Sequence, residues 1–139
     1  MSKAIETIQK AMETAEKVRP QIGGFPYLAE VLRSAGVVRN QWYLPSCQCV
    51  FLTKYGEVVS QGQPLVSGMF DIPKFDEKAL VLALRTDQAG KSTFPEFLNA
   101  AWKAGVLNYD VDFENRTVTY YGALGESYME EYPAVEIPQ

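Results

Sequence analysis

The sequence contains no histidine among its 139 residues and only two cysteines. Histidine is the commonest general base and the commonest metal ligand in proteins. Its absence excludes Ser-His-Asp and Cys-His catalytic groups, and it excludes zinc or iron sites with histidine ligands. Two cysteines are too few for a disulfide framework. We therefore expect no catalytic residues, no metal site and no cofactor.

Long hydrophobic runs and an excess of basic residues are also missing. The longest apolar stretch, 79–84, is far shorter than the roughly 20 residues that span a bilayer. The N-terminus is charged and amphipathic, which is not the pattern of a signal peptide. With 17 acidic and 13 basic residues, the formal net charge is −4, which argues against non-specific nucleic-acid binding. We expect a cytoplasmic protein that binds neither nucleic acid nor membranes.

The composition that is present is typical of a folded domain. Hydrophobic residues make up 47% of the chain and aromatic residues 12%. Such a chain buries enough apolar surface to fold, and its length matches one domain covering residues 1–139.

The spacing of apolar residues predicts two helices followed by three strands, and then the same order again. Helical spacing covers about 2–18 and 25–35, and a period of two covers 37–44, 47–53 and a strand that begins at Glu57. A connector at 61–74 contains two prolines and two glycines. Further helices are expected at about 77–87 and 94–104, with strands at about 106–113, 116–122 and 126–131.

The two halves are related by a constant offset of 69 residues. Between residues 25–57 and 94–126, seven of 33 ungapped positions are identical: Phe25, Pro26, Ala35, Gly36, Val37, Gly56 and Glu57 each recur 69 residues later. Chance would give about two identities from average residue usage. We interpret the chain as an internal duplication of two ααβββ units, at about 1–60 and 75–132.

The strand pattern predicts an antiparallel sheet with helices on one face only. Asn40, Trp42 and Leu44 alternate with more polar residues, and the second unit repeats this alternation. One apolar and one mixed face are typical of an α+β fold whose helices all pack on one side. The uncovered face is then the expected place for function or self-association.

That uncovered face is expected to carry tyrosine and aliphatic side chains as well as polar ones. The candidate interface or ligand residues are Tyr43, Val50, Leu52, Asp110, Asp112, Thr119 and Tyr121. A patch of this kind favours a subunit interface over a ligand platform. We therefore expect a homodimer.

The carboxylates are the groups on this face that could carry chemistry. Asp110 and Asp112, with Glu114 beyond them, should align along one strand and could act as an acid-base pair or bind a hard cation. Glu57 and Glu126 recur after the repeated glycine. The favoured interpretation of the aspartates is a solvated strand face, which also discourages edge pairing.

Cys47 and Cys49 are separated by one residue on a predicted strand, so both sulfur atoms should point to the same side. Two thiolates without histidine make a poor zinc site, and neighbouring same-face positions suit a disulfide badly. We expect both to be small buried hydrophobic residues.

Several short motifs resemble those of a known family. The stretches 88–91, 104–106, 109–112, 117–121 and 125–126 resemble the YbcV-like family of small bacterial, prophage-associated proteins, a domain of unknown function sometimes labelled "phage envelope protein". The likeness is clearest in residues 75–126. Its motifs are turns, caps and core positions, so the resemblance implies no catalytic residues.

The sequence thus favours a non-catalytic binding or protein-interaction module that self-associates through the uncovered sheet face. The alternative is a small-molecule binder or hydrolase-like enzyme. It would use Asp110, Asp112, Glu126 and nearby tyrosines at the seam between the units.

Overall fold

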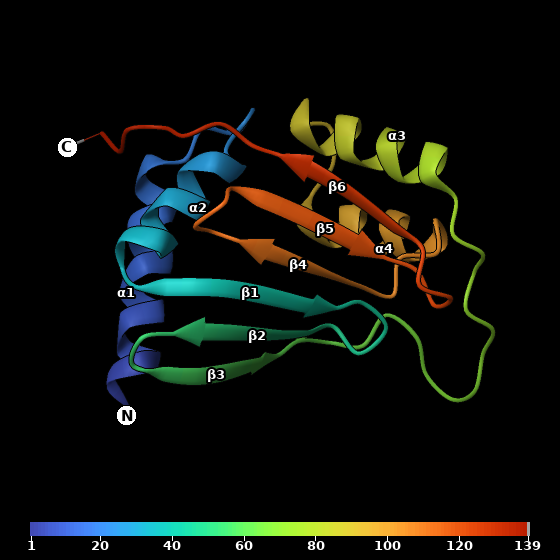
Figure 1. Ribbon diagram of the computed structural model, residues 1–139, viewed down its shortest axis with the longest axis horizontal. Helices are drawn as coiled ribbons and strands as arrows, with labels where there is room; N and C mark the ends of the chain where they lie inside the picture. The colour runs from blue at the N-terminus through green and yellow to red at the C-terminus, as the bar shows by residue number, and fades with distance from the viewer. Residues whose placement is uncertain (139) are drawn as a thin grey trace.

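The computed structural model describes residues 1–138 and begins with two helices (Figure 1). Helix α1 covers Lys3–Val18, and the Ser2 side chain caps it by accepting a hydrogen bond from the Ile5 amide at 3.1 Å. Helix α2 covers Phe25–Ser34 and has a proline in its first turn. Small residues on the buried stripe of α1 allow the two helices to pack closely: Ala4, Ala11 and Ala15.

Three antiparallel strands complete the first unit. Strand β1 covers Val37–Tyr43, β2 covers Gln48–Thr53 and β3 covers Gly56–Gln61. Their sequential pairing through short turns follows from the period-two pattern in the sequence.

The second unit repeats the order. Helix α3 covers Glu77–Gln88 and α4 covers Phe94–Lys103, where Thr93 and Glu96 form a capping box. Strands β4, β5 and β6 cover Asn108–Asp112, Thr117–Tyr121 and Ser127–Glu131. The predicted elements are confirmed, with ends that differ from the predicted ends by one or two residues in most cases.

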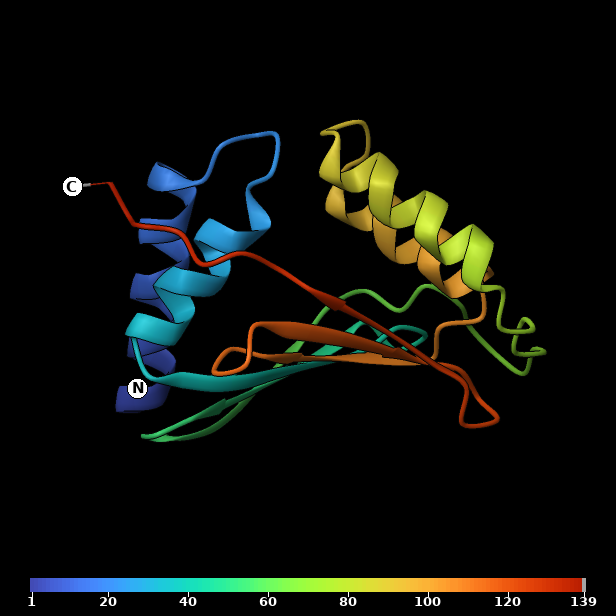
Figure 2. The same cartoon turned by 45° about the horizontal axis from the view of Figure 1, so that its top comes forward.

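All six strands form one antiparallel sheet in the order β3-β2-β1-β4-β5-β6. Figure 2 shows both helix pairs above the sheet, with α1 and α2 over one end and α3 and α4 over the other. The other face, which is turned toward the viewer in Figure 1, has no helix over it. The predicted α+β class, with helices on one face, is confirmed.

The two units meet where β1 pairs with β4. In this register Gln41 lies opposite Asp110, and these two residues are themselves 69 apart in the sequence. Arg39 lies opposite Asp112 on one side of that pair, and Tyr43 lies opposite Asn108 on the other. A pseudo-two-fold axis therefore passes through the Gln41–Asp110 pair. We call the β1–β4 junction the seam.

The duplication is also visible in the backbone and the core. The non-glycine residues with positive φ are Cys47 (53°) and Arg116 (54°), which occupy equivalent turns of the two units. Leu44 and Phe113 are equivalent, and both are fully buried. Buried side chains of the two units form a single cluster.

The segment that follows each unit packs on the second helix of the other unit. Phe70 of the connector makes an edge-on ring contact with Trp102 of α4, with ring centroids 5.8 Å apart. Tyr132, just after β6, makes the same kind of contact with Phe25 of α2 at 5.1 Å. Figures 1 and 2 show the C-terminal segment crossing α2 toward α1. Both contacts add to the pairing at the seam.

The prediction about the cysteines is wrong for Cys47. Strand β2 begins at Gln48, and Cys47 lies in the preceding turn with positive φ, where it is only partly buried. Cys49 is buried, as expected, and its sulfur accepts a hydrogen bond from the Asn40 side chain at 2.8 Å. Burial raises the pKa of the Cys49 thiol to about 12, although the Asn40 hydrogen bond opposes this. The thiol therefore stays protonated and unreactive at neutral pH.

None of the helices in residues 1–138 is long and apolar enough to cross a membrane.

Replacing Gly105 with alanine should destabilise the fold more than the same change at Gly125. Both glycines have left-handed φ angles, 89° and 87°, so alanine is strained at both positions, by about 1–2 kcal/mol. At Gly105 a Cβ atom would also overlap the Lys74 carbonyl group and the Phe75 backbone, whereas at Gly125 it would meet open space. Denaturant unfolding should give a loss of about 3 kcal/mol or more for Gly105→Ala and about 1 kcal/mol for Gly125→Ala. Equal losses would show that the connector does not hold its place against α4.

Candidate functional site: the open face of the sheet

The open face is the sheet surface without helices, and its side chains form three rows across the six strands. From β3 to β6, the central row is Val59, Val50, Gln41, Asp110, Thr119 and Met129. One flanking row is Glu57, Leu52, Arg39, Asp112, Thr117 and Glu131. The other is Gln61, Gln48, Tyr43, Asn108, Tyr121 and Ser127. All seven candidate residues from the sequence therefore lie on this one face.

Apolar side chains flank the seam on both sides. Val59 and Met129, at the two ends of the central row, are 58% and 54% exposed. Tyr43 and Tyr121, on either side of the seam in a flanking row, are 39% and 36% exposed. Val50 and Leu52 are partly buried by their neighbours. The exposed apolar surface thus comes from both units.

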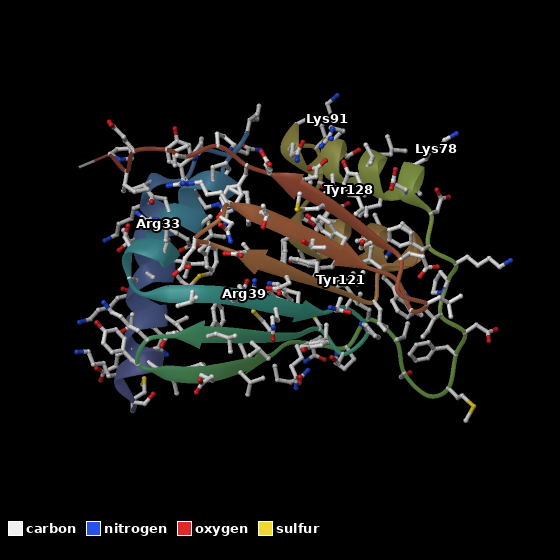
Figure 3. The ribbon with its side chains drawn as sticks, viewed as in Figure 1. Arg33, Arg39, Lys78, Lys91, Tyr121 and Tyr128 are labelled. Carbon is white, nitrogen blue, oxygen red and sulfur yellow. The ribbon has the colours of Figure 1, made fainter. Side chains whose placement is uncertain are left out.

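The centre of the face holds one arginine and two carboxylates. Arg39 Nη1 lies 2.8 Å from Asp110 Oδ2, and Arg39 Nη2 lies 3.1 Å from Asp112 Oδ2. Figure 3 shows Arg39 at the middle of the sheet. Both aspartate side chains are only 16% exposed. The expectation of a solvated pair is therefore wrong, because the register of β1 against β4 places an arginine beside them.

The two carboxylates differ in how completely they are hydrogen-bonded. Asp112 accepts the amide hydrogens of Glu114 and Asn115 and a side-chain hydrogen bond from Asn115. Asp110 accepts only from Arg39, and its Oδ1 atom is buried with no hydrogen-bond partner. A buried oxygen without a donor is destabilising, and such oxygens are rare in folded proteins.

This difference moves the two pKa values in opposite directions. Burial raises the pKa of Asp110, which the Asp112 charge also favours and the Arg39 charge opposes. Burial acts in the same direction on Asp112, but hydrogen bonds from Asn115 and Arg39 outweigh it and lower the pKa of that carboxyl. Asp110 is therefore the carboxyl of the pair that takes up a proton first as the pH falls.

The remaining carboxylates do not join this group. Glu114 is exposed in the turn after β4 instead of continuing the strand. Glu126 precedes β6, and its side chain accepts a hydrogen bond from the Leu124 amide within its own turn. The structure thus does not assemble the expected set of Asp110, Asp112 and Glu126. Within residues 1–138, no three acidic or cysteine side chains are grouped so that they could hold a metal ion.

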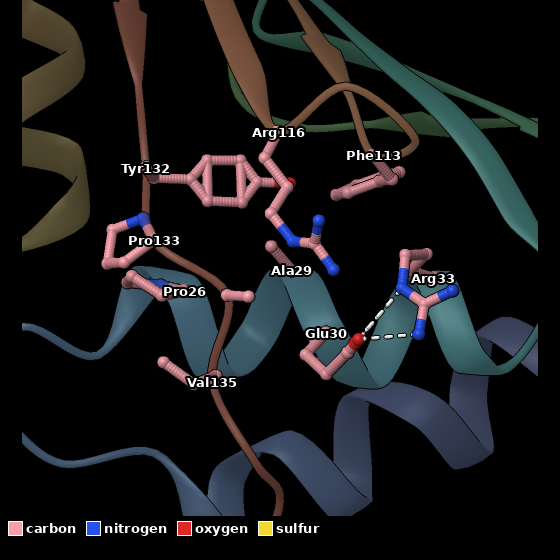
Figure 4. A pocket seen from close by; sticks show the side chains of 10 residues that line it. Pro26, Ala29, Glu30, Arg33, Phe113, Arg116, Tyr132, Pro133 and Val135 are labelled. Atoms are coloured by element: carbon pink, nitrogen blue, oxygen red, sulfur yellow. Dashed lines mark hydrogen bonds and ion pairs between the residues drawn. The ribbon is translucent and has the colours of Figure 1, made fainter.

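Two hollows lie on the helical side, and neither is lined by Asp110 or Asp112. The smaller, between α2, the β4–β5 turn and the C-terminal segment, has a volume of about 10 Å³, roughly the space for one water molecule. Figure 4 shows that Glu30, at its rim, pairs with Arg33, and this contact is 2.7 Å long. The larger, about 470 Å³, is an open and mainly apolar groove between α1, α2 and Ile137.

The sequence identified the aspartates but missed the role of Arg39. Arg39 was placed on the same face as Tyr43, without a partner. The signal that pairs it with Asp112 is the equivalence of Gln41 and Asp110 at an offset of 69, provided that the duplicated strands pair with each other.

Replacing Arg39 with glutamine should destabilise the protein at neutral pH, because it leaves two largely buried carboxylates without a counter-charge. Since the Arg39 side chain is 42% exposed, solvent screens the pair, and we expect a loss of about 1–2 kcal/mol. The folded-state pKa of Asp110 should rise further above its unfolded value, so the loss should shrink as the pH falls. Denaturant unfolding at several pH values measures this.

Arg39→Lys is the matched variant, because it keeps the charge but cannot bridge both carboxylates with a planar fork. It should lose less stability than Arg39→Gln. If the loss in Arg39→Gln were the same at every pH, the aspartates would not be its cause.

Comparison with known proteins gives the family of the chain. A 54% identical relative is uncharacterized protein Mb2035 of Mycobacterium bovis, and the alignment covers 98% of this chain and 83% of the relative. Uncharacterized proteins MT2067 and Rv2012 of Mycobacterium tuberculosis are similar to the same extent. A family model described as "Protein of unknown function (DUF1398)" matches residues 12–131. The chain, with its two ααβββ units and open sheet face, therefore belongs to the DUF1398 family.

Proposed function

We propose that the protein is a non-catalytic interaction module whose open face binds a second copy of the same chain. The observation that carries this proposal is the distribution of exposed apolar side chains on the open face. They lie on both sides of the seam, with Val59 and Tyr43 from one unit and Met129 and Tyr121 from the other.

This distribution suits an interface between identical copies. In a symmetric dimer the same patch must be complementary to itself, and the open face offers similar chemistry at both ends. Two sheets that pack face to face lie about 10 Å apart, a distance that Val, Leu, Met and Tyr side chains fill. The helices would then lie outside, and the two apolar flanks would be removed from water.

The charged centre of the face also fits an interface better than a catalytic site. Both aspartates bind the same arginine, so neither is free to act on a substrate without breaking that contact. An interface with a polar centre and apolar flanks would owe its affinity to the flanks and its alignment to the charges.

A single aspartate on the open face should dissociate the dimer. Leu52→Asp and Tyr121→Asp each place a charge among side chains that the partner copy would cover, and the dissociation constant should rise at least roughly tenfold. Leu82→Asp is the matched control, because Leu82 lies on α3 and is 68% exposed. Light scattering at several concentrations measures all three, together with the unmodified protein.

The unmodified protein should be dimeric at micromolar concentration, and Leu82→Asp should remain so. A strict monomer, or equal dissociation by all three substitutions, would contradict the proposal. Circular dichroism of each variant separates loss of association from loss of folding.

A second candidate, a small-molecule binder or hydrolase-like enzyme at the seam, is favoured by the opposite pKa shifts of Asp110 and Asp112. Carboxylates whose pKa values are pushed apart are typical of acid-base pairs. A thermal-shift screen against metabolites and divalent ions tests it, since a ligand of the native state raises the melting temperature. Stabilisation of the unmodified protein, but not of Asp110→Asn, would support this second function over the first.

The likeness to YbcV-like, prophage-associated proteins remains a prediction about origin. The family description and the names of the mycobacterial relatives mention neither a prophage nor an envelope.

A further inference from the structure

We infer that Asp110 is a proton-binding site that couples association of the open face to pH, so that the dimer is strengthened as the solution becomes more acidic. This inference rests on the proposed function, since it concerns the regulation of the same face. It starts from the charge at the seam and from the one buried side-chain oxygen there that has no donor.

The seam carries one more negative charge than positive charge. Arg39 is shared between Asp110 and Asp112, and these are the charged groups that face Asp110. Across β4, strand β5 presents Thr117, Thr119 and Tyr121, none of which is charged at neutral pH. One carboxylate of the pair is therefore uncompensated.

The hydrogen bonds decide which carboxyl neutralises this excess. A proton on Asp112 would compete with the hydrogen bonds from Glu114, Asn115 and Arg39. A proton on Asp110 Oδ1 displaces no hydrogen bond, because that atom has none, while Oδ2 can keep accepting from Arg39. The site of protonation is thus set by geometry.

Covering the face makes protonation of Asp110 more favourable. The carboxylate still has 16% of its side-chain surface exposed, and a second copy would remove that remaining contact with water. Burial penalises the charged form of a carboxyl, so Asp110 should have a higher pKa in the dimer than in the monomer. Association then takes up a proton at Asp110 in each copy, and by linkage it strengthens as the pH falls.

The test compares dissociation constants from about pH 7.5 to about pH 5.5 in the unmodified protein, Asp110→Asn and Asp71→Asn. The effect can reach roughly tenfold per pH unit for each proton taken up. Asp110→Asn imitates the neutral carboxyl, so it should associate more tightly than the unmodified protein at the higher pH and show little change on acidification. Asp71 is exposed in the connector, so Asp71→Asn makes the same change in net charge away from the face and should behave like the unmodified protein.

A carboxyl-carbon NMR titration of Asp110 at low and high protein concentration gives a second measurement. Its pKa should be higher in the associated protein. The inference is overturned if Asp110→Asn keeps the pH dependence of the unmodified protein, or if the Asp110 titration is independent of concentration.

The two proposals fail in distinguishable ways. A dimer whose dissociation constant does not change with pH overturns the coupling and leaves the interaction module intact. A protein that stays monomeric at every pH, in the Asp110→Asn variant as well, overturns both.

Discussion

The antiparallel pairing of β1 with β4 is the interaction on which the rest of the structure depends. It joins two three-stranded sheets into one and relates the two units by a pseudo-two-fold axis at Gln41 and Asp110. Because this axis is perpendicular to the sheet, both helix pairs lie on the same side. The pairing therefore creates the covered core and the open face together, and either unit alone would have an unpaired strand at its edge.

The two faces of the seam treat their polar groups differently. On the helical side, buried Asn40 donates to Cys49 and Val50 and accepts from Trp42, so its polar atoms are satisfied within one unit. On the open side, Arg39 serves two carboxylates and Asp110 keeps an oxygen without a donor. A buried polar group that is fully bonded stabilises one structure, whereas an unsatisfied one responds to whatever changes its surroundings. This contrast is the reason to place function on the open face.

Most of the fold could be predicted from local patterns. The helix caps at Ser2 and Thr93, the period-two strands and the constant offset of 69 residues gave the elements and their order. The errors fall in turns. Cys47 and Glu114 continue the alternation of their neighbours in the sequence, yet each lies in a turn between strands. Alternation does not show where a strand ends, because a short turn with one positive φ interrupts it without a glycine.

The sequence by itself determined two ααβββ units, the absence of histidine chemistry and the set of side chains that share the open face. These depend on residue type and on spacing within a single unit. Only the tertiary structure decided which strands meet, that Arg39 bridges Asp110 and Asp112, and that one aspartate is satisfied while the other is not. These features join residues about 70 positions apart in the chain, and a shift in the β1–β4 register would give each of them a different partner.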